Sequence, residues 1–254
     1  MFSIELCQSN LNTKILANQI FYNSTTKSTN SDIWEIFKKK KREGIVVIAN
    51  EQFAGRGRGL KKWFSKKNKS ITFSFLVEEK FSKNEIGLHS ILIPVGIIKG
   101  IKKSIKENLS VKWPNDVMFE NKKLGGVLIE TKTYKKSLYL NIGIGLNINE
   151  SLSDFPDEIK DSASSLKIIS NKNIQREIVL ANILNSIDQL LQNSNAQDVI
   201  SSWTKLCNHI NKEIEIKYKN KVIKAVFKKI NCNGQAILNY NNENLIFDGA
   251  ILES

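Results

Sequence analysis

A segment rich in glycine and arginine lies between two runs that have the pattern of β-strands, and this arrangement limits the fold more than any other feature of the chain. Residues 45–49, Ile-Val-Val-Ile-Ala, are continuously apolar, and residues 71–77 alternate between apolar and polar side chains. Continuous apolar runs of this length are typical of buried strands, and alternation is typical of half-buried ones. Residues 51–59 are therefore predicted to form a loop between two strands of a sheet.

Helical spacing of apolar residues predicts helices near residues 30–43, 86–105, 174–191 and 199–210. Asn30 and Asn173 are predicted to cap the first and third helices, and Gly44 is predicted to end the first. Pro94 fits the second helix only in its first turn or at a kink. Further short strands are expected at residues 111–113, 127–130 and 138–142, so the fold class is α+β with a mixed sheet.

The pattern changes after Lys212 to short alternating runs at residues 214–218, 222–227, 236–238 and 245–247, separated by turn residues. Such a series indicates a small β-barrel. We therefore predict two domains, a large one over residues 1–212 and a small one over residues 213–254.

The chain of 254 residues carries a formal net charge of +13. This charge favours either a polyanionic partner or charges scattered over a solvated surface. Its three cysteines are far apart and it has only two histidines, which argues against a zinc site or a disulfide framework. Neither a signal peptide nor an apolar run of about 20 residues is present, so we expect a cytoplasmic protein without a membrane span.

The segment Gly55-Arg56-Gly57-Arg58-Gly59 combines backbone that can approach a ligand closely with two planar guanidinium donors. Its spacing matches neither the phosphate loop of nucleotide hydrolases nor the dinucleotide-binding fingerprint. The segment alone leaves three interpretations open, which are an anion-binding loop, a flexible RNA contact and a plain hairpin connection.

Two further segments carry polar groups beside predicted strands. Lys112-Trp113-Pro114-Asn115-Asp116 places an amide and a carboxylate at a strand end, and a simple turn is the alternative. Residues 122–130, Lys-Lys-Leu-Gly-Gly-Val-Leu-Ile-Glu, bring lysines to two glycines that run into a strand, where a tight hairpin is the alternative.

The order and spacing of these three segments resemble the biotin-protein ligase family. The resemblance covers nearly the whole chain, including the tail, which is similar to the family's C-terminal SH3-like barrel. It implies a mixed-sheet catalytic domain of the biotin/lipoate ligase type. It also implies an enzyme that forms biotinyl-5'-AMP from biotin and ATP with Mg²⁺, releases diphosphate, and transfers biotin to a lysine of a carboxylase's biotin carboxyl carrier protein.

The resemblance also implies roles for individual residues. The ureido ring of biotin would be held by Ser28, Thr29, Asn30 and Gln52. The loop that closes over biotin and its adenylate would contain Gly55, Arg56, Gly57 and Arg58. Trp63 and Asn147 would lie near the adenine, Asn115 and Asp116 at the nucleotide end, and the backbone of Gly126 beside biotin. Lys112 would also bind the cofactors.

Lys123 matches the family lysine between the biotin carboxylate and the α-phosphate, and is the first candidate for catalysis, together with Arg58 and Asp116. Asp116 would either bind Mg²⁺ or orient the incoming amine. Two departures stand out, because Lys27 replaces a usual aspartate and Gly59-Leu60 differs from the common pattern after the loop.

About 27 residues precede Ser28, too few for a winged-helix domain, so we expect no specific binding of DNA. A homodimer remains open. A lipoate or octanoate ligase or transferase of the same superfamily is the nearest alternative, and a basic RNA-binding module is an alternative from another class.

Overall fold

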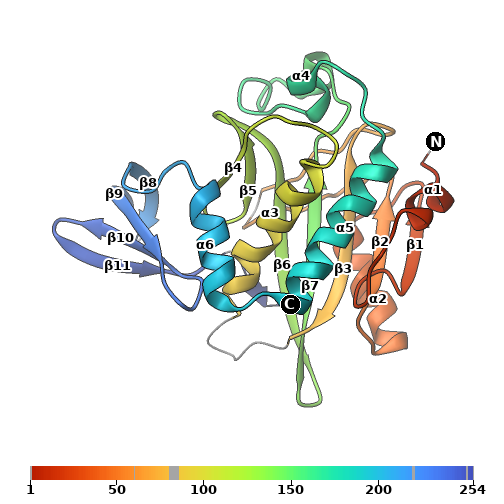
Figure 1. Ribbon diagram of the computed structural model, residues 1–254, viewed down its shortest axis with the longest axis horizontal. Helices are drawn as coiled ribbons and strands as arrows, with labels where there is room; N and C mark the ends of the chain where they lie inside the picture. The colour runs from red at the N-terminus through yellow and green to blue at the C-terminus, as the bar shows by residue number, and fades with distance from the viewer. Residues whose placement is uncertain (1, 60, 80–85, 219–220, 250, 254) are drawn as a thin grey trace.

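A computed structural model of the chain describes residues 2–59, 61–79, 86–218, 221–249 and 251–253. Its main feature is a sheet with strand order β1-β2-β3-β7-β6-β5-β4 (Figure 1). These strands are β1 (Gln19–Asn23), β2 (Ile45–Ala49), β3 (Ile71–Glu78), β4 (Leu109–Lys112), β5 (Asp116–Phe119), β6 (Lys122–Tyr134) and β7 (Ser137–Leu146). Strands β1 and β2 are parallel and the other neighbours antiparallel, which confirms the predicted mixed sheet.

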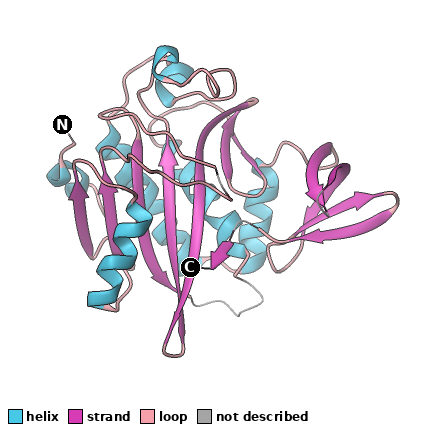
Figure 2. Cartoon of the chain, turned by 180° about the vertical axis from the view of Figure 1, so that it is seen from behind, coloured by secondary structure: helices cyan, strands magenta, loops and turns pink. Residues whose placement is uncertain are grey.

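Helices cover both faces of this sheet (Figures 1 and 2). One face carries α3 (Leu88–Ile101), α5 (Arg176–Asn193) and α6 (Ala196–Leu206), and α1 (Ile4–Ser9) packs beside α5. The opposite face carries α2 (Thr29–Lys40), whose Ile33 and Phe37 pack on Val47 of β2 and Leu76 of β3. The short helices η2 (Leu152–Asp154) and α4 (Leu166–Ser170) follow β7. Apolar burial on both faces holds the central strands, and thus the loops at their ends, in fixed positions.

The helices agree with the sequence pattern in position but differ at their ends. Ser28, not Asn30, is the N-cap residue of α2, because the Asn30 side chain instead accepts a hydrogen bond from Ser74 of β3. Lys41 in a left-handed conformation ends that helix, and Gly44 lies directly before β2. Gln175, not Asn173, is the N-cap residue of α5. Pro94 lies in the middle of α3.

Strands β6 and β7 are longer than the sequence pattern predicted. Lys123 and Gly125, expected to precede a strand, already pair within β6, and Gly143 and Gly145 pair within β7. Glycine has weak strand propensity, so the pattern underestimates both strands. Several elements were not expected from the sequence pattern, among them the strands β1 and β5 and the helices α1 and α4.

The C-terminal part forms a second, four-stranded antiparallel sheet of order β11-β10-β9-β8. Its strands are β8 (Glu213–Tyr218), β9 (Lys221–Ile230), β10 (Ala236–Tyr240) and β11 (Glu243–Phe247). The last strand, β12 (Ile251–Glu253), leaves this sheet and pairs in parallel with β6. The division of the chain at residue 212 stays a prediction.

Candidate functional site

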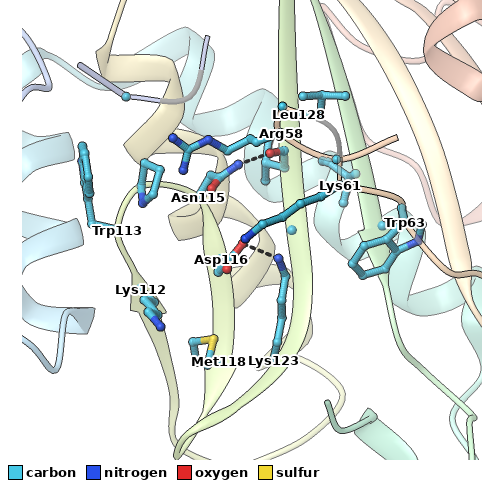
Figure 3. Close-up of a pocket in the computed structure, with 18 of the residues that line it drawn as sticks. Arg58, Lys61, Trp63, Lys112, Trp113, Asn115, Asp116, Met118, Lys123 and Leu128 are labelled. Carbon is cyan, nitrogen blue, oxygen red and sulfur yellow. Dashed lines mark hydrogen bonds and ion pairs between the residues drawn. The ribbon is translucent and has the colours of Figure 1, made fainter. Parts of the chain in front are cut away.

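A cavity of about 1300 Å³ lies where the glycine-arginine loop, the β4–β5 hairpin and the small sheet meet (Figure 3). Its lining includes most of the residues predicted for the site, namely Ser28, Thr29, Asn30, Gln52, Arg56, Gly57, Arg58, Trp63, Lys112, Asn115, Asp116, Lys123 and Gly126. Segments separated by almost 100 positions in the sequence therefore converge on one cavity. Two predicted residues, Gly55 and Asn147, are absent from the lining.

Asn147 has a structural role in the described part of the chain. Its Nδ2 donates a hydrogen bond to the carbonyl of Ser164 at 3.0 Å, and its backbone amide donates to Leu124 at 2.8 Å. Asn147 thus ties the segment after β7 to β6, and its predicted contact with adenine remains a prediction.

The glycine-arginine loop folds back on itself as a small hairpin. The backbone amide of Gly57 donates to the carbonyl of Lys61 at 2.8 Å, and that of Trp63 donates to Gly55 at 2.9 Å. Gly59 has a φ of +60° at the turn, a left-handed conformation that glycine adopts at little cost. Leu60, one of the two unusual residues after the loop, lies outside the described residues.

The second departure from the family pattern, Lys27, precedes the loop and has an exposed side chain. Its carbonyl accepts a hydrogen bond from the backbone amide of Ala54 at 3.0 Å. The main chain of Lys27, and not its side chain, therefore holds the start of the loop.

Trp63 lies against a stretch of β7 that has no side chain to block it. A Cβ on Gly145 would lie 2.2 Å from Cε2 of Trp63, so only glycine permits this packing. The indole nitrogen of Trp63 is buried and has no hydrogen-bond partner among the described residues. Buried donors are usually satisfied, so this nitrogen fits a contact with a bound ligand.

Lys123 and Asp116 form an ion pair inside the cavity, with 2.6 Å between Nζ and Oδ1 (Figure 3). The two side chains lie on the paired strands β5 and β6, beside a register shift between Val117 and Met118. The backbone of Lys123 is held on both sides, because its amide donates to Ser162 and its carbonyl accepts from Ser164. The lysine is 38% exposed and the aspartate 26%, so both remain accessible to a ligand.

Asn115 positions this ion pair. It is buried, its Nδ2 donates to the carbonyl of Val127, and its own carbonyl accepts from the amide of Val127 at 3.1 Å. These two bonds fix the turn after the cis peptide bond between Trp113 and Pro114. The predicted display of Asp116 at a strand end is thus the result of Asn115 being anchored to β6.

Arg58 adds a second positive charge near Asp116. Desolvation lowers the pKa of the Arg58 guanidinium, and the Asp116 carboxylate opposes that shift. Lys61, Lys62 and Lys112 also line the cavity. The excess of cations at this end favours a polyphosphate ligand, and we call it the phosphate end, defined by Arg58, Asp116 and Lys123.

His209 borders the phosphate end and is buried. Its Nε2 accepts a hydrogen bond from the backbone amide of Trp113 at 3.4 Å. Desolvation, followed by the charges of Lys112 and Lys212, lowers the pKa of His209 to about 4. The imidazole is therefore neutral at physiological pH.

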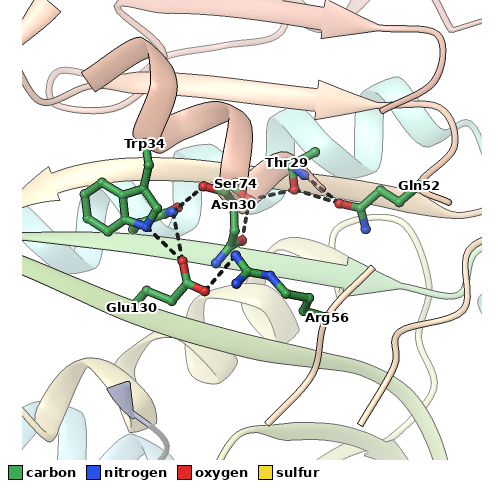
Figure 4. A network of polar contacts seen from close by, with 8 residues as sticks. Thr29, Asn30, Trp34, Gln52, Arg56, Ser74 and Glu130 are labelled. Carbon is green, nitrogen blue, oxygen red and sulfur yellow. Dashed lines mark hydrogen bonds and ion pairs between the residues drawn. The ribbon is translucent and has the colours of Figure 1, made fainter. Parts of the chain in front are cut away.

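The opposite end of the cavity contains a hydrogen-bonded network of polar side chains (Figure 4). Gln52 Oε1 accepts from the backbone amide of Thr29 at 2.7 Å and from its hydroxyl at 3.1 Å. Ser74 Oγ lies 2.7 Å from both Thr29 Oγ1 and Asn30 Oδ1. A Cβ on Gly143 would lie 1.9 Å from Asn30 Oδ1, so glycine is required there. We call this end the ring end, after the ureido ring that the family resemblance predicts there, and define it by Thr29, Asn30, Gln52 and Ser74.

Arg56 and Arg58 have different partners in the structure, and their predicted closure over the adenylate stays a prediction. The Arg56 guanidinium lies 2.8 Å from Glu130 Oε1, beside the ring end (Figure 4). Glu130 was not among the predicted site residues, although it ends the segment Lys-Lys-Leu-Gly-Gly-Val-Leu-Ile-Glu. The two arginines of the loop therefore lie at different ends of the cavity.

Three network residues were missed from sequence, namely Ser74, Glu130 and Asn141. Each interrupts a strongly apolar strand, and a buried polar residue in such a strand needs a partner. This rule could have identified the three residues from the sequence, but it does not indicate which partner each of them contacts.

No group of three or more histidine, cysteine, aspartate or glutamate residues able to hold a metal ion occurs among the described residues. Within the described ranges, no helix has the length and apolar character needed to cross a membrane.

Known proteins share this fold and this sequence pattern. The model of the biotin/lipoate A/B protein ligase family matches residues 22–147. The bifunctional ligase/repressor BirA of Bacillus subtilis is 31% identical over 175 residues, which are 68% of this chain and 54% of that protein. The chain therefore spans about half the length of this relative. Human biotin--protein ligase is 30% identical over 159 residues, 59% of this chain and 22% of that protein.

Among solved structures, the biotin protein ligase from Aquifex aeolicus in complex with biotin and ATP superposes with a TM-score of 0.76 at 25% identity. The match covers 92% of this chain and 97% of that one. The agreement extends over both sheets. The chain therefore belongs to the biotin/lipoate A/B protein ligase family.

Proposed function

We propose that the protein is an ATP-dependent biotin-protein ligase that makes biotinyl-5'-AMP and transfers biotin to a lysine of a carrier protein. One observation carries the proposal most directly. A single cavity holds the polar ring end and, beside it, the phosphate end with the Lys123–Asp116 ion pair. The similarity to a ligase whose structure contains biotin and ATP supports the same assignment.

The ring end fits the ureido group of biotin, which has two N–H donors and one carbonyl acceptor. Thr29, Asn30 and Gln52 line the cavity, and their polar groups can serve both kinds of partner. Asn30 Nδ2 is buried without a hydrogen-bond partner among the described residues, so a ligand carbonyl would satisfy it. A site built to hydrogen-bond a polar ring discriminates strongly against ligands that lack it.

In the first step, a biotin carboxylate oxygen would attack the α-phosphorus of ATP, and the bond from that phosphorus to the diphosphate oxygen would break. The ammonium group of Lys123 would offset the negative charge of both reactants and of the transition state. Asp116 holds Lys123 Nζ at 2.6 Å and so fixes its position before the ligand arrives. Arg58, a cation near Asp116, would bind the adenylate.

In the second step, the neutral amine of the carrier lysine would attack the acyl carbon, AMP would leave, and the amine would lose a proton. Asp116 is the carboxylate of the phosphate end and is 26% exposed, so it can orient the amine. The partner would be the biotin carboxyl carrier protein of a carboxylase.

Mg²⁺ would be brought by ATP. The described residues offer no ready-made metal cluster, and Asp116 is already paired with Lys123. Mg²⁺ is commonly held by one or two carboxylates together with substrate phosphates, so Asp116 fits a single ligand position. Bound there, the ion would neutralise charge on the phosphates.

A cytoplasmic location and a homodimer belong to the same proposal. Cys7, Cys207 and Cys232 are free thiols, as is usual for proteins in a reducing compartment. Light scattering of the purified protein with and without biotin and ATP would measure the assembly state.

The test is to incubate the purified protein with biotin, Mg-ATP and a biotin-acceptor domain. We expect diphosphate release, biotinyl-5'-AMP and a biotinylated lysine, and no activity with lipoate or octanoate. Activity with lipoate or octanoate instead of biotin would favour the other branch of the family. Tight, salt-sensitive RNA binding with no diphosphate release would contradict the ligase.

A further inference from the structure

Glu130 is a buried carboxylate with three donors around it. Its side chain is 5% exposed, Arg56 NH2 lies 2.8 Å from Oε1, and Trp34 Nε1 donates to Oε2 at 2.9 Å. Asn141 Nδ2 lies 3.5 Å from Oε2. A buried charge is stable only where it is paired and hydrogen-bonded, so Glu130 strongly favours loop conformations that keep Arg56 in place.

This carboxylate is also connected to the ring end. Asn141 Nδ2 donates to the carbonyl of Asn30 at 2.8 Å, and the Asn30 side chain accepts from Ser74. Ser74 contacts Thr29, which in turn donates to Gln52. The network is continuous from Glu130 to Gln52 (Figure 4).

The loop is therefore anchored twice to the same network, at Gln52 through Thr29 and at Arg56 through Glu130. The two anchors are four positions apart in the chain, on either side of Gly55. The backbone amide of Gln52 also donates a hydrogen bond to the Ser65 hydroxyl at 3.1 Å. Movement of the first half of the loop away from the ring end would break the pair between Arg56 and Glu130 and leave a buried charge with fewer partners.

We infer that Glu130 is a positioning residue that holds the glycine-arginine loop against the ring end through Arg56, and so sets the affinity for biotin without taking part in the chemistry. The inference rests on the proposed function for the identity of the ligand. The anchoring of the loop by Glu130, in contrast, can be tested on the protein without any ligand.

The informative variant is Glu130→Gln. The amide oxygen can still accept from Trp34, so the fold is retained, but the charge that binds Arg56 is gone. Because Arg56 is 47% exposed, solvent screens the pair, and we expect a moderate effect. The KM for biotin should rise about two- to fivefold, while kcat for adenylate formation stays within about twofold.

A second readout does not depend on activity. The loop contains Arg56 and Arg58 and is followed by Lys61 and Lys62, and trypsin cleaves after residues of both types. Without ligand, Glu130→Gln should be cut in and after the loop about two- to fivefold faster than the wild type, because local opening becomes more frequent by the same factor.

The matched control is Glu35→Gln. Glu35 pairs with Lys38 at 2.7 Å on α2, but both side chains are exposed, at 67% and 58%. This variant changes the net charge equally and should leave the trypsin rate and the biotin KM unchanged. Combining Glu130→Gln with Arg56→Gln should raise the KM no further than either change alone, since both remove one interaction.

Equal trypsin rates for Glu130→Gln and the wild type would overturn the inference. So would a fall in kcat with an unchanged KM, or additive effects in the double variant. A wild-type protein that makes no adenylate would instead contradict the proposed function, and the trypsin comparison would still decide whether Glu130 anchors the loop.

Discussion

The ring end and the phosphate end of the cavity are built in opposite ways. Thr29 and Asn30 are 3% and 4% exposed, and their polar groups are largely bonded to one another before any ligand binds. Lys123 and Asp116 are 38% and 26% exposed and rely on a single ion pair. Under the proposed function, recognition is thus preorganised in a buried network, whereas the charges for chemistry face solvent and would become stronger only when a ligand excludes water.

The largest effect should come from the phosphate end. Lys123→Gln removes a charge aimed at the reacting groups, and we expect adenylate formation to slow by about 10²- to 10³-fold. Single-turnover kinetics with biotin and Mg-ATP would measure this rate. Lys122→Gln, an exposed neighbour, is the control and should stay close to the wild type. Equal losses of rate in the two variants would contradict a special role of Lys123 at the phosphate end.

Protonation of His209, which borders the phosphate end, should make the stability of the fold depend on pH. The pKa of His209 is about 4 in the folded protein and 6.5 in its reference state, so the unfolded chain binds a proton first as the pH falls. Stability is fully present above about pH 6.5 and is lost progressively down to about pH 4, by up to about 3 kcal/mol. Urea unfolding at several pH values would show this loss, and His209→Gln should reduce it.

Arg58→Ala should separate retention of the intermediate from its synthesis. Loss of one charged donor should speed release of the adenylate about tenfold, because a charged hydrogen bond contributes roughly 1.5 to 3 kcal/mol. Adenylate formation should change less than its release. Filter trapping of labelled adenylate would measure both rates, and full retention by the variant would contradict this role.

The smallest effect should be seen at the ring end, in stability. Ser74→Ala removes a hydroxyl that contacts Thr29 and Asn30, and should lower the free energy of unfolding by about 1 kcal/mol. Urea denaturation would measure it, with Ser153→Ala as an exposed control. A loss of kcat with no change in stability would mean that the ring end takes part in chemistry after all.

The sequence pattern predicted the central strands and the main helices because these depend on local periodicity, as at residues 45–49 and 71–77. The residues that line the cavity were assigned from the family resemblance of the three polar segments, since no local pattern shows that these segments converge. The different partners of Arg56 and Arg58 could not be predicted, because they depend on the side of the hairpin to which each side chain points. Glu130 was missed because its partners, Arg56, Trp34 and Asn141, are distant in the chain.

The return of β12 to the large sheet has a mechanical consequence. The small sheet is connected to the large domain before Glu213 and again through β12, which pairs with Ile129, Glu130 and Thr131. Buried side chains of the small sheet, among them Phe227 of β9 and Leu238 of β10, also belong to the main hydrophobic core. The wall that this sheet adds to the cavity is therefore fixed both by packing and by two chain connections, and one of these connections pairs with Glu130.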